Sequence, residues 1–282
     1  MMAATARGVL YIVATPIGNL EDVTLRAIRV LAEAQLVLAE DTRRTRVLLT
    51  AHGIDARPIS MHAHNEMARV EKTLEVLGRG GHVALVSDAG TPLVSDPGGR
   101  LVAAAIEAGF AVQAIPGASA VLSALTISGL PAERFLFVGF LPRKAIARDE
   151  LLERLQTAPE TLVFFESPHR LAETLERLAR VLGARRACVA RELTKLHEEA
   201  ARGSLEELAE RFVDGTRGEV TLVVEGAPPK SPLSDVRELD DDIGKRLAEG
   251  ESFKAIAAEL APVSGLSKRA IYARAIELKN EG

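Results

Sequence analysis

The chain has 282 residues, a formal net charge of −4 and a hydrophobic fraction of 47%. A length of this order predicts about two globular domains, and the acidic balance argues against a uniformly basic nucleic-acid coat while leaving local basic patches open. The single cysteine, Cys188, excludes an intrachain disulfide and favours a reducing, cytoplasmic setting.

Two apolar segments have features of membrane or targeting signals. The N-terminal run is too short to span a bilayer and lacks a signal-peptide cleavage site. Residues 108–132 contain no charge and are long enough to span one, but Pro116 and Gly117 divide them into a predicted strand and a predicted helix. We therefore expect a protein without membrane contact.

The first half of the chain alternates short strands and helices, which is the rhythm of a mostly parallel α/β sheet. Strands are predicted at residues 9–14, 36–39, 57–61, 83–86 and 111–115. Helices are predicted at residues 25–34, 42–51, 66–77, 99–108 and 118–127.

The pattern breaks near Gly129, and a second α/β set follows. Its predicted strands cover residues 135–140, 161–165, 187–190 and 219–224, and its helices cover residues 146–156, 168–181 and 205–212. A Pro-rich segment, residues 227–232, reads as a linker, after which only helical patterning remains. We expect domains at 1–128, 129–230 and 231–282.

The last domain contains a helix, a turn with Gly265 and a helix capped by Ser267, a pattern typical of a helix-turn-helix. Two helices docked on the body of the protein remain the alternative.

The most informative stretch is residues 83–99. A buried strand, residues 83–86, leads into a loop built from Ser, Asp, Gly, Thr and Pro. Ligands of open α/β sheets bind outside the carboxyl ends of strands, and Gly90 permits close approach of backbone to a ligand. The alternative is a plain connection in which Asp96 caps the next helix.

Other strand ends also carry polar groups. The segment from Glu40 to Arg46 places two carboxylates beside arginines, which suits a polyanion or, alternatively, a solvated helix start. His62 and His64 form a His-x-His pair, but no further ligand completes a metal set, so no metal is expected.

With these residues in view, the chain resembles the bacterial 16S rRNA (cytidine 2′-O)-methyltransferases of the tetrapyrrole methylase superfamily. The resemblance rests on the ordered segments LYIVATPIGNLEDVTLRA, AEDTRRT, HNE, LVSDAGTPLVSDPG, PGASA, GFLPRK, FFESPHR, ARELTK and GEVTLVVEG. It implies two α/β domains with S-adenosylmethionine held in the cleft between them, usually in a homodimer.

The implied reaction is 2′-O-methylation of a cytidine ribose in the decoding region of 16S rRNA, with the 30S subunit as the expected partner. Two alternatives stay open: a relative that methylates a small tetrapyrrole such as a precorrin, and a non-catalytic module that binds S-adenosylmethionine or RNA.

The resemblance also implies cofactor contacts, although Thr91 stands where the superfamily has Asp, which leaves Asp88 or Asp96 as the replacement carboxylate. The expected cofactor contacts are Ile17, Asp88, Gly90, Thr91, Pro92, Val94, Asp96, Ser119, Ala120, Phe165, Val220 and Leu222.

A base or cation near the ribose oxygen should assist transfer, because a 2′-hydroxyl is a poor acid. The sequence does not choose among the catalytic candidates Glu40, Asp41, Arg43, His62, His64, Glu66, Lys144 and Glu166. RNA phosphates are expected to contact Arg43, Arg44, Arg46, Arg143, Lys144, Lys268 and Arg269.

Overall fold

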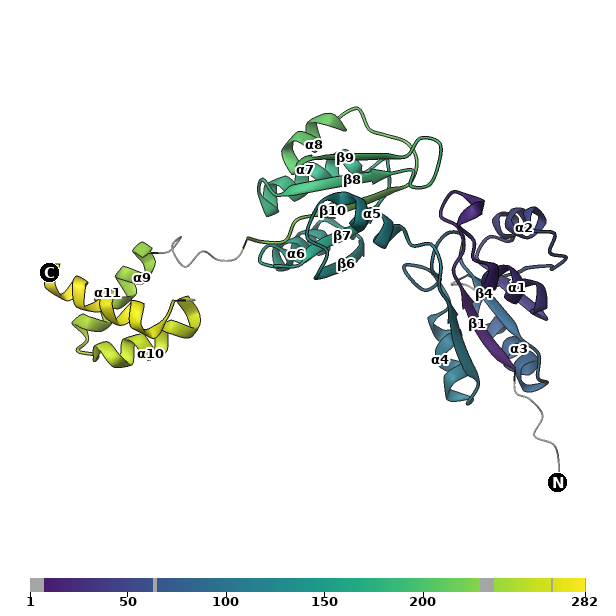
Figure 1. Cartoon of the computed structure of the whole chain (residues 1–282), viewed down its shortest axis with the longest axis horizontal. Coiled ribbons are helices and arrows are strands. Elements are labelled where there is room, and N and C mark those ends of the chain that lie inside the picture. Colours follow the sequence, from purple (N-terminus) through teal and green to yellow (C-terminus); the bar gives the residue numbers. More distant parts are fainter. Residues whose placement is uncertain (1–7, 63–64, 229–235, 265, 282) are drawn as a thin grey trace, which may run out of the picture. The chain divides into compact units, whose positions relative to one another are not determined.

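The computed structural model describes residues 8–62, 65–228, 236–264 and 266–281. The chain divides into two compact units, residues 1–227 and 228–282 (Figure 1). The expected linker at residues 227–232 lies where the chain divides, although most of it falls outside the described residues.

The first sheet of the larger unit is entirely parallel, as the sequence predicts. Its strands are β1 (Val9–Val13), β2 (Leu36–Ala39), β3 (Ile59–Ser60), β4 (Val83–Val86) and β5 (Ala111–Ile115), in the order β3-β2-β4-β1-β5. Each pair of neighbours runs parallel. The loops that follow β1, β2 and β4 therefore meet at one edge.

Helices cover both faces of this sheet. They are α1 (Leu25–Glu33), α2 (Thr42–Ala51), α3 (Glu66–Gly78) and α4 (Gly99–Glu107), with a short 3-10 helix, η1 (Leu20–Asp22), before α1. Alternate strand residues face opposite helices: Val37 packs with α1 and α2, whereas Leu38 packs with α3 and α4. Such two-sided burial explains why these strands read as continuous apolar runs.

The second sheet is mixed. It contains β6 (Phe135–Phe140), β7 (Thr161–Glu166), β8 (Arg186–Arg191), β9 (Glu199–Ser204) and β10 (Val220–Val224), in the order β6-β7-β10-β8-β9. The pair β6–β7 is parallel and the other pairs are antiparallel. Helices α6 (Ala145–Leu155), α7 (Leu171–Leu182) and α8 (Leu205–Arg211) pack against it.

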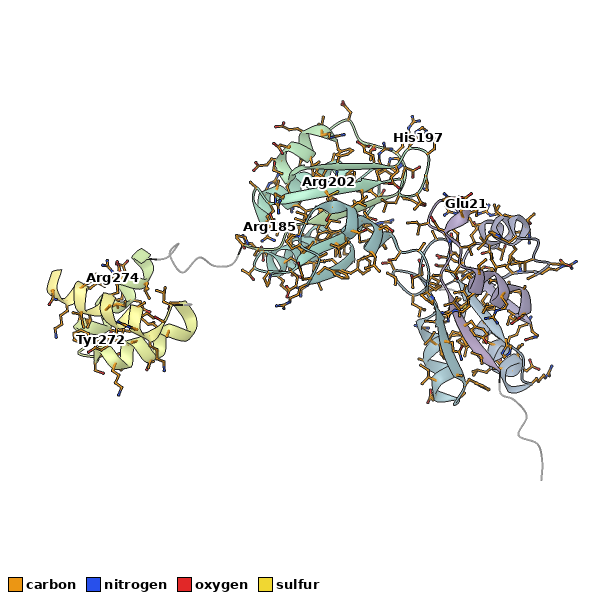
Figure 2. The ribbon with its side chains drawn as sticks, viewed as in Figure 1. Glu21, Arg185, His197, Arg202, Tyr272 and Arg274 are labelled. Carbon is orange, nitrogen blue, oxygen red and sulfur yellow. The ribbon has the colours of Figure 1, made fainter. Side chains whose placement is uncertain are left out.

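Strand β9 is absent from the sequence prediction. Its residues, Glu-Ala-Ala-Arg-Gly-Ser, contain no β-branched or aromatic side chain, so they carry little strand signal. Pairing with β8 along its whole length holds it in place. Arg202 of this strand (Figure 2) also donates to the carbonyl oxygen of Ser128 at 3.2 Å.

Helix α5 (Ala120–Ser128) packs against the second sheet and not the first. Its residues Val121 and Leu125 share a core with Val163 and Val223. The change from one sheet to the other therefore lies before α5, whereas the expected domain boundary follows it at residue 129. Gly129 ends this helix in the left-handed region, with φ of 76°, and a helix end need not be a domain boundary.

The second unit consists of α9 (Val236–Ala248), α10 (Phe253–Ser264) and α11 (Lys268–Glu281). These helices build a core of their own around Ile243, Ile256 and Ile271. Ser267 caps α11, because its side chain accepts from the backbone N–H of Ala270 at 3.2 Å. Among the described residues, every helix is too short or too polar to cross a bilayer.

Candidate active site

A cavity of about 440 Å³ lies in the larger unit where loops of the two sheets meet. The first sheet contributes the loop after β4 and the entry to α5, and the second contributes the ends of β6 and β7 and the start of β10. The volume falls within the roughly 300–1,000 Å³ range of small-molecule sites. The organising loop of the sequence is thus part of a built cavity.

The loop after β4 is held in an unusual backbone conformation. Gly90 has φ of 79°, and its N–H and C=O pair with the C=O and N–H of Thr15 at 3.0 and 2.9 Å. Leu93 and Ser95 also lie in the left-handed region, with φ of 75° and 68°. Non-glycine residues adopt this region at a cost, and such residues cluster at ligand sites.

The structure gathers the expected cofactor residues around this cavity, with two exceptions. Pro92 is buried, and Leu222 is fully buried in the core on the face of the second sheet that α6, α7 and α8 cover. Its neighbour Thr221 lines the cavity, because successive strand residues face opposite sides. The expected residues that line the cavity are Ile17, Asp88, Gly90, Thr91, Val94, Asp96, Ser119, Ala120, Phe165 and Val220.

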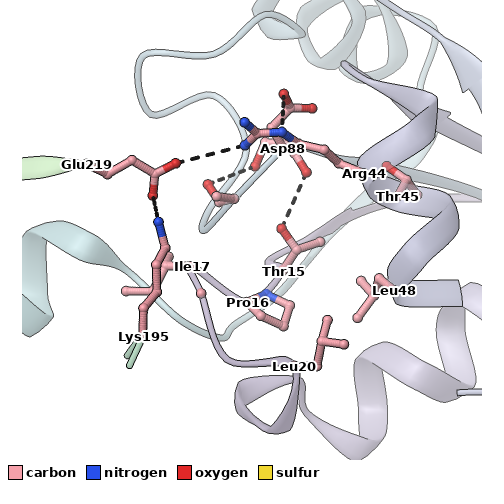
Figure 3. Close-up of a pocket in the computed structure, with 13 residues that line it drawn as sticks. Thr15, Pro16, Ile17, Leu20, Arg44, Thr45, Leu48, Asp88, Lys195 and Glu219 are labelled. Carbon is pink, nitrogen blue, oxygen red and sulfur yellow. Dashed lines mark hydrogen bonds and ion pairs between the residues drawn. The ribbon is translucent and has the colours of Figure 1, made fainter. Parts of the chain in front are cut away.

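A second, smaller cavity of about 290 Å³ adjoins the first (Figure 3). The loop after β1 and helix α2 form one side of it, and Lys195 and Glu219 from the second sheet form the other. The two cavities share the lining residues Ile17, Arg44, Asp88, Ala89 and Glu219.

A chain of ion pairs crosses this shared wall. Lys195 Nζ lies 2.9 Å from Glu192 Oε1 and 3.0 Å from Glu219 Oε2. The guanidinium of Arg44 lies 3.9 Å from Glu219 Oε1 and 3.8 Å from Asp88 Oδ2 (Figure 3). Burial opposes the charge on Lys195, but hydrogen bonds to Glu192 and Glu219 outweigh it and raise the lysine pKa.

The loop after β8 holds Lys195 in position. Glu192 and Thr194 have φ of 52° and 65°, and Thr194 Oγ1 accepts from the backbone N–H of Asn19 at 3.0 Å, which joins this loop to the one after β1. The sequence analysis gave Lys195 and Glu219 no role. Lys195 follows the predicted strand 187–190 and Glu219 opens the predicted strand 219–224, and only the pairing of β8 with β10 brings them together.

Carboxylates crowd the end of β2 and the loop after β4. Burial, followed by the charges of Asp96 and Asp88, raises the pKa of Glu40. Burial also raises the pKa of Asp96. Asp41 behaves differently, because hydrogen bonds from Arg43 lower its pKa to about 2.

Of the catalytic candidates that lie in the described part of the chain, Glu166 is the one that lines a cavity. It is buried, and its carboxylate accepts from the N–H of Ser167 at 2.7 Å and from Thr174 Oγ1 at 2.6 Å. Glu66 instead caps α4, accepting from the N–H of Arg100 at 3.0 Å. The described candidates outside both linings are Glu40, Asp41, Arg43, His62, Glu66 and Lys144, and His64 lies outside the described residues.

Within the described part of the chain, no group of three or more His, Cys, Asp or Glu side chains is arranged to hold a metal ion. The acidic crowding near Asp96 is therefore not a metal cluster in the structure.

The basic residues expected to contact RNA fall into three exposed groups. Arg43, Arg44 and Arg46 lie on α2, Arg143 and Lys144 precede α6, and Lys268 and Arg269 open α11. Two nearby arginines are engaged elsewhere: Arg148 contacts Glu173 at 2.8 Å, and Arg274 (Figure 2) contacts Asp240 at 2.6 Å.

Residues 9–209 match the family model of Tetrapyrrole (Corrin/Porphyrin) Methylases. A protein of Mesorhizobium japonicum named ribosomal RNA small subunit methyltransferase I is 48% identical over 274 residues, which cover 96% of this chain and 92% of the relative. The protein of that name from Escherichia coli O157:H7 is 43% identical over 282 residues, covering 98% and 97%.

Solved structures share the fold at lower identity. A cobalt precorrin-4 methyltransferase gives a TM-score of 0.60 at 17% identity, covering 77% of this chain and 94% of that one. Uroporphyrin-III C-methyltransferase from Thermus thermophilus, complexed with S-adenosyl homocysteine, gives 0.56 at 24% identity, covering 77% and 97%. The chain thus belongs to the tetrapyrrole methylases and, within them, to the family of ribosomal RNA small subunit methyltransferase I.

Proposed function

We propose that this protein transfers a methyl group from S-adenosylmethionine to the ribose 2′-oxygen of a cytidine in the decoding region of 16S rRNA. The observation that carries the proposal is the shared wall between two adjoining cavities, one for the cofactor and one for the acceptor. Relatives that match nearly the full chain are named for small-subunit rRNA methylation, which favours RNA over a tetrapyrrole.

The larger cavity fits the cofactor. Val94, Phe140 and Phe165 give it apolar surface for a purine ring, and exposed backbone of the loop after β4 gives hydrogen-bonding groups. Asp88 and Asp96 supply negative charge near a cationic sulfonium, in place of the carboxylate that Thr91 lacks. When bound, S-adenosylmethionine supplies an activated methyl group on that sulfonium.

Asp88 is the carboxylate that we assign as proton acceptor for the 2′-hydroxyl. It lines both cavities, so it faces the place where cofactor and acceptor meet. Its Oδ1 accepts the backbone N–H of Asp41 at 2.7 Å, which fixes the carboxylate, and Oδ2 faces Arg44. A positioned base of this kind contributes about 10²–10⁴-fold to rate.

RNA is held through phosphates by the exposed basic groups on α2, before α6 and at the start of α11. Several separate contacts suit a large, structured substrate, which we take to be the assembled 30S subunit in the cytoplasm. The chain contains no Trp and two Tyr, so it offers few aromatic surfaces on which bases could stack. This composition favours recognition of the RNA backbone and shape.

We further propose that the protein acts as a homodimer. Strand β6 lies at an edge of the second sheet and, outside both cavity linings, exposes Phe135 and Leu136. Exposed apolar side chains at a sheet edge are typical of protein interfaces. Light scattering after size exclusion measures the expected dimer mass, and a monomer at micromolar concentration would contradict this part of the proposal.

The first experiment incubates the protein with labelled S-adenosylmethionine and 30S particles from cells that lack the native enzyme. Nuclease digestion and mass spectrometry then identify the nucleosides, and we expect 2′-O-methylcytidine. Free 16S rRNA and a precorrin serve as competing acceptors. Methylation of the precorrin alone would overturn the RNA assignment.

The same assay tests the proton acceptor. Asp88→Asn keeps an oxygen that accepts the Asp41 N–H but removes the basic carboxylate, so we expect the rate to fall about 100-fold or more. Because Asp88 also supplies negative charge beside the sulfonium, calorimetry should show some loss of cofactor affinity, but a smaller loss than the loss of rate. An unchanged rate would assign the base elsewhere.

A further inference from the structure

The walls of the smaller cavity divide by chemistry. Pro16, Ile17, Leu20 and Leu48 give it apolar lining, of which Pro16, Ile17 and Leu48 are buried. The charged lining residues are Arg44, Asp88, Lys195 and Glu219 (Figure 3). Enzymes that hold an extruded nucleobase pack its faces against apolar side chains and hydrogen-bond its polar edge, so this division matches a nucleobase.

We propose that the smaller cavity binds the base of the acceptor cytidine, turned out of its RNA strand, and that Glu219 accepts a hydrogen bond from the N4 amino group. This inference rests on the proposed function, which names the nucleoside but not the group that recognises it. Glu219 and Asp88 belong to both linings. Because N4 and the ribose lie at opposite ends of cytosine, a base that reaches Glu219 with N4 must lie along the shared wall to place its ribose near Asp88.

Glu219 can take this additional hydrogen bond. Its Oε2 contacts Lys195 at 3.0 Å and its Oε1 lies 3.9 Å from Arg44, and each carboxylate oxygen offers two acceptor positions. The side chain is 58% exposed, so a ligand in the cavity can reach it.

The charge pattern distinguishes cytosine from uracil. Cytosine presents the N4 donor beside the N3 and O2 acceptors, so a base with N4 toward Glu219 turns acceptors toward the cations Lys195 and Arg44. Uracil presents the acceptor O4 where cytosine has N4. Two acceptors would then face each other without a proton, and sites built to bond a polar group reject such analogues strongly.

Glu219, the side chain that we propose to recognise N4, is held in place by its neighbours before any ligand binds. Lys195 is fixed between Glu192 and Glu219, and Thr194 ties the same loop to Asn19. A group fixed by its neighbours discriminates better than a mobile one, because less freedom is lost on binding.

The test compares Glu219→Gln with Glu225→Gln. The two glutamates flank β10, and each is paired with a basic side chain: Glu219 with Lys195 and Glu225 with Arg186 at 2.7 Å. Glutamine keeps the size of the side chain but donates as readily as it accepts. Glu225 lies outside both cavity linings, so it controls for loss of an ion pair.

Mass spectrometry of RNA fragments first locates the methylated position. The substrates are 30S particles that carry either cytidine or uridine at that position, and mass spectrometry gives the initial rate of 2′-O-methylation of each. We expect the unsubstituted protein and Glu225→Gln to prefer cytidine by at least about tenfold, and Glu219→Gln to lose most of that preference. An unchanged cytidine preference in Glu219→Gln would overturn the inference and leave the proposed function standing.

A second variant tests occupancy of the cavity. Leu20 is 38% exposed and lines the smaller cavity but not the larger one. We expect Leu20→Trp to fill the cavity and lower the methylation rate by about tenfold or more, while calorimetric affinity for S-adenosylmethionine stays within about twofold. A full methylation rate in Leu20→Trp would overturn the inference. If the unsubstituted protein methylates neither particle, the proposed function falls and the inference falls with it.

Discussion

The two sheets of the larger unit deliver residues to the cavities in different ways. In the first sheet all neighbours are parallel, so only loops that follow strands meet at the site. In the second sheet β10 runs antiparallel to β7 and β8, and Val220 pairs with both Glu166 and Arg191. A residue that precedes a strand, Glu219, therefore joins residues that follow strands.

The sheets also differ in what they contribute. The first supplies backbone in special conformations, as at Gly90, Leu93 and Ser95. The second supplies charged side chains on the shared wall, Lys195 and Glu219, which meet Arg44. This contrast predicts that a change at Gly90 affects mainly the cofactor, and that changes around Lys195 and Glu219 affect mainly the acceptor.

The largest effect is expected from Gly90→Val. The new Cβ would lie 3.3 Å from Ile17 Cγ2, and φ of 79° is strongly disfavoured for a β-branched residue. Distortion at Gly90 should disturb its hydrogen bonds with Thr15 and reshape the larger cavity. We therefore expect calorimetry to show a loss of S-adenosylmethionine affinity of about 100-fold or more.

Gly53→Val is the matched control for this substitution. Gly53 has φ of 65°, but a Cβ there meets no atom within 4 Å. It carries the same kind of backbone strain away from either cavity, and its cofactor affinity should be unchanged. Equal losses in both variants would mean that strain on the fold, and not the cavity, explains the effect.

A smaller effect is expected from Gly218→Ala in the second half. Its Cβ would clash with Glu192 Oε1, so the Glu192 side chain must move away from Lys195. Gly218 also lines the larger cavity, so we expect RNA methylation to slow by about tenfold and cofactor affinity to fall as well, but less than in Gly90→Val. Gly215→Ala, with φ of 80° and open space, is the control. A loss of cofactor binding equal to that of Gly90→Val would erase the contrast between the sheets.

Much of the fold could be predicted from local pattern. The continuous apolar runs of β2 and β4 fixed those strands residue by residue, since strands buried on both faces carry no polar interruption. Strand β9 and the packing of α5 could not be predicted. Strand β9 depends on its pairing with β8, and the packing of α5 depends on which sheet its apolar face contacts. Both are properties of the tertiary structure.

The same division holds at the site. The Gly and Pro content of the loop after β4 identifies it as a candidate ligand loop, and the resemblance to a known family adds expected cofactor contacts such as Ser119, which lines the larger cavity. Lys195 ends the segment ARELTK and Glu219 opens the predicted strand 219–224, and neither segment by itself gives its charge a role. Their proximity arises from an antiparallel pairing across 24 residues, which no local pattern contains.

A further prediction separates phosphate contact from cofactor binding in the first half. Arg43 has an 85% exposed side chain, is paired with Asp41 and lies outside both cavities. We expect Arg43→Ala to weaken RNA methylation several-fold and to lower the slope of log affinity against log salt by about 1, as loss of one phosphate contact does. Arg79→Ala removes an exposed arginine paired with Glu75 and should leave both unchanged. A large loss of cofactor affinity in Arg43→Ala would contradict this assignment.

The smallest effect concerns pH and again contrasts the two halves. Burial raises the pKa of Asp96 above its ordinary value of 3.8, so the folded protein keeps this proton to higher pH than the unfolded chain does. As pH rises through 3.8, the unfolded state releases the proton first and the folded state loses relative stability. Asn cannot ionise, so the stability advantage of Asp96→Asn should be absent at lower pH and should grow as pH rises, then level off above the folded pKa.

Glu192 in the second half should show the opposite sign. The hydrogen bond from Lys195 lowers the pKa of Glu192 below its ordinary value of 4.5, so its ionised form stabilises the folded state above that pH and the contribution is lost as pH falls through the lowered pKa. Glu192→Gln should therefore be less stable than the unsubstituted protein at neutral pH and approach it in acid. Urea unfolding of both variants without cofactor, across a pH series, measures the two trends. If the stability differences of the two variants change with pH in the same direction, Asp96 is not a carboxylate destabilised by burial while Glu192 is one stabilised by its ion pair.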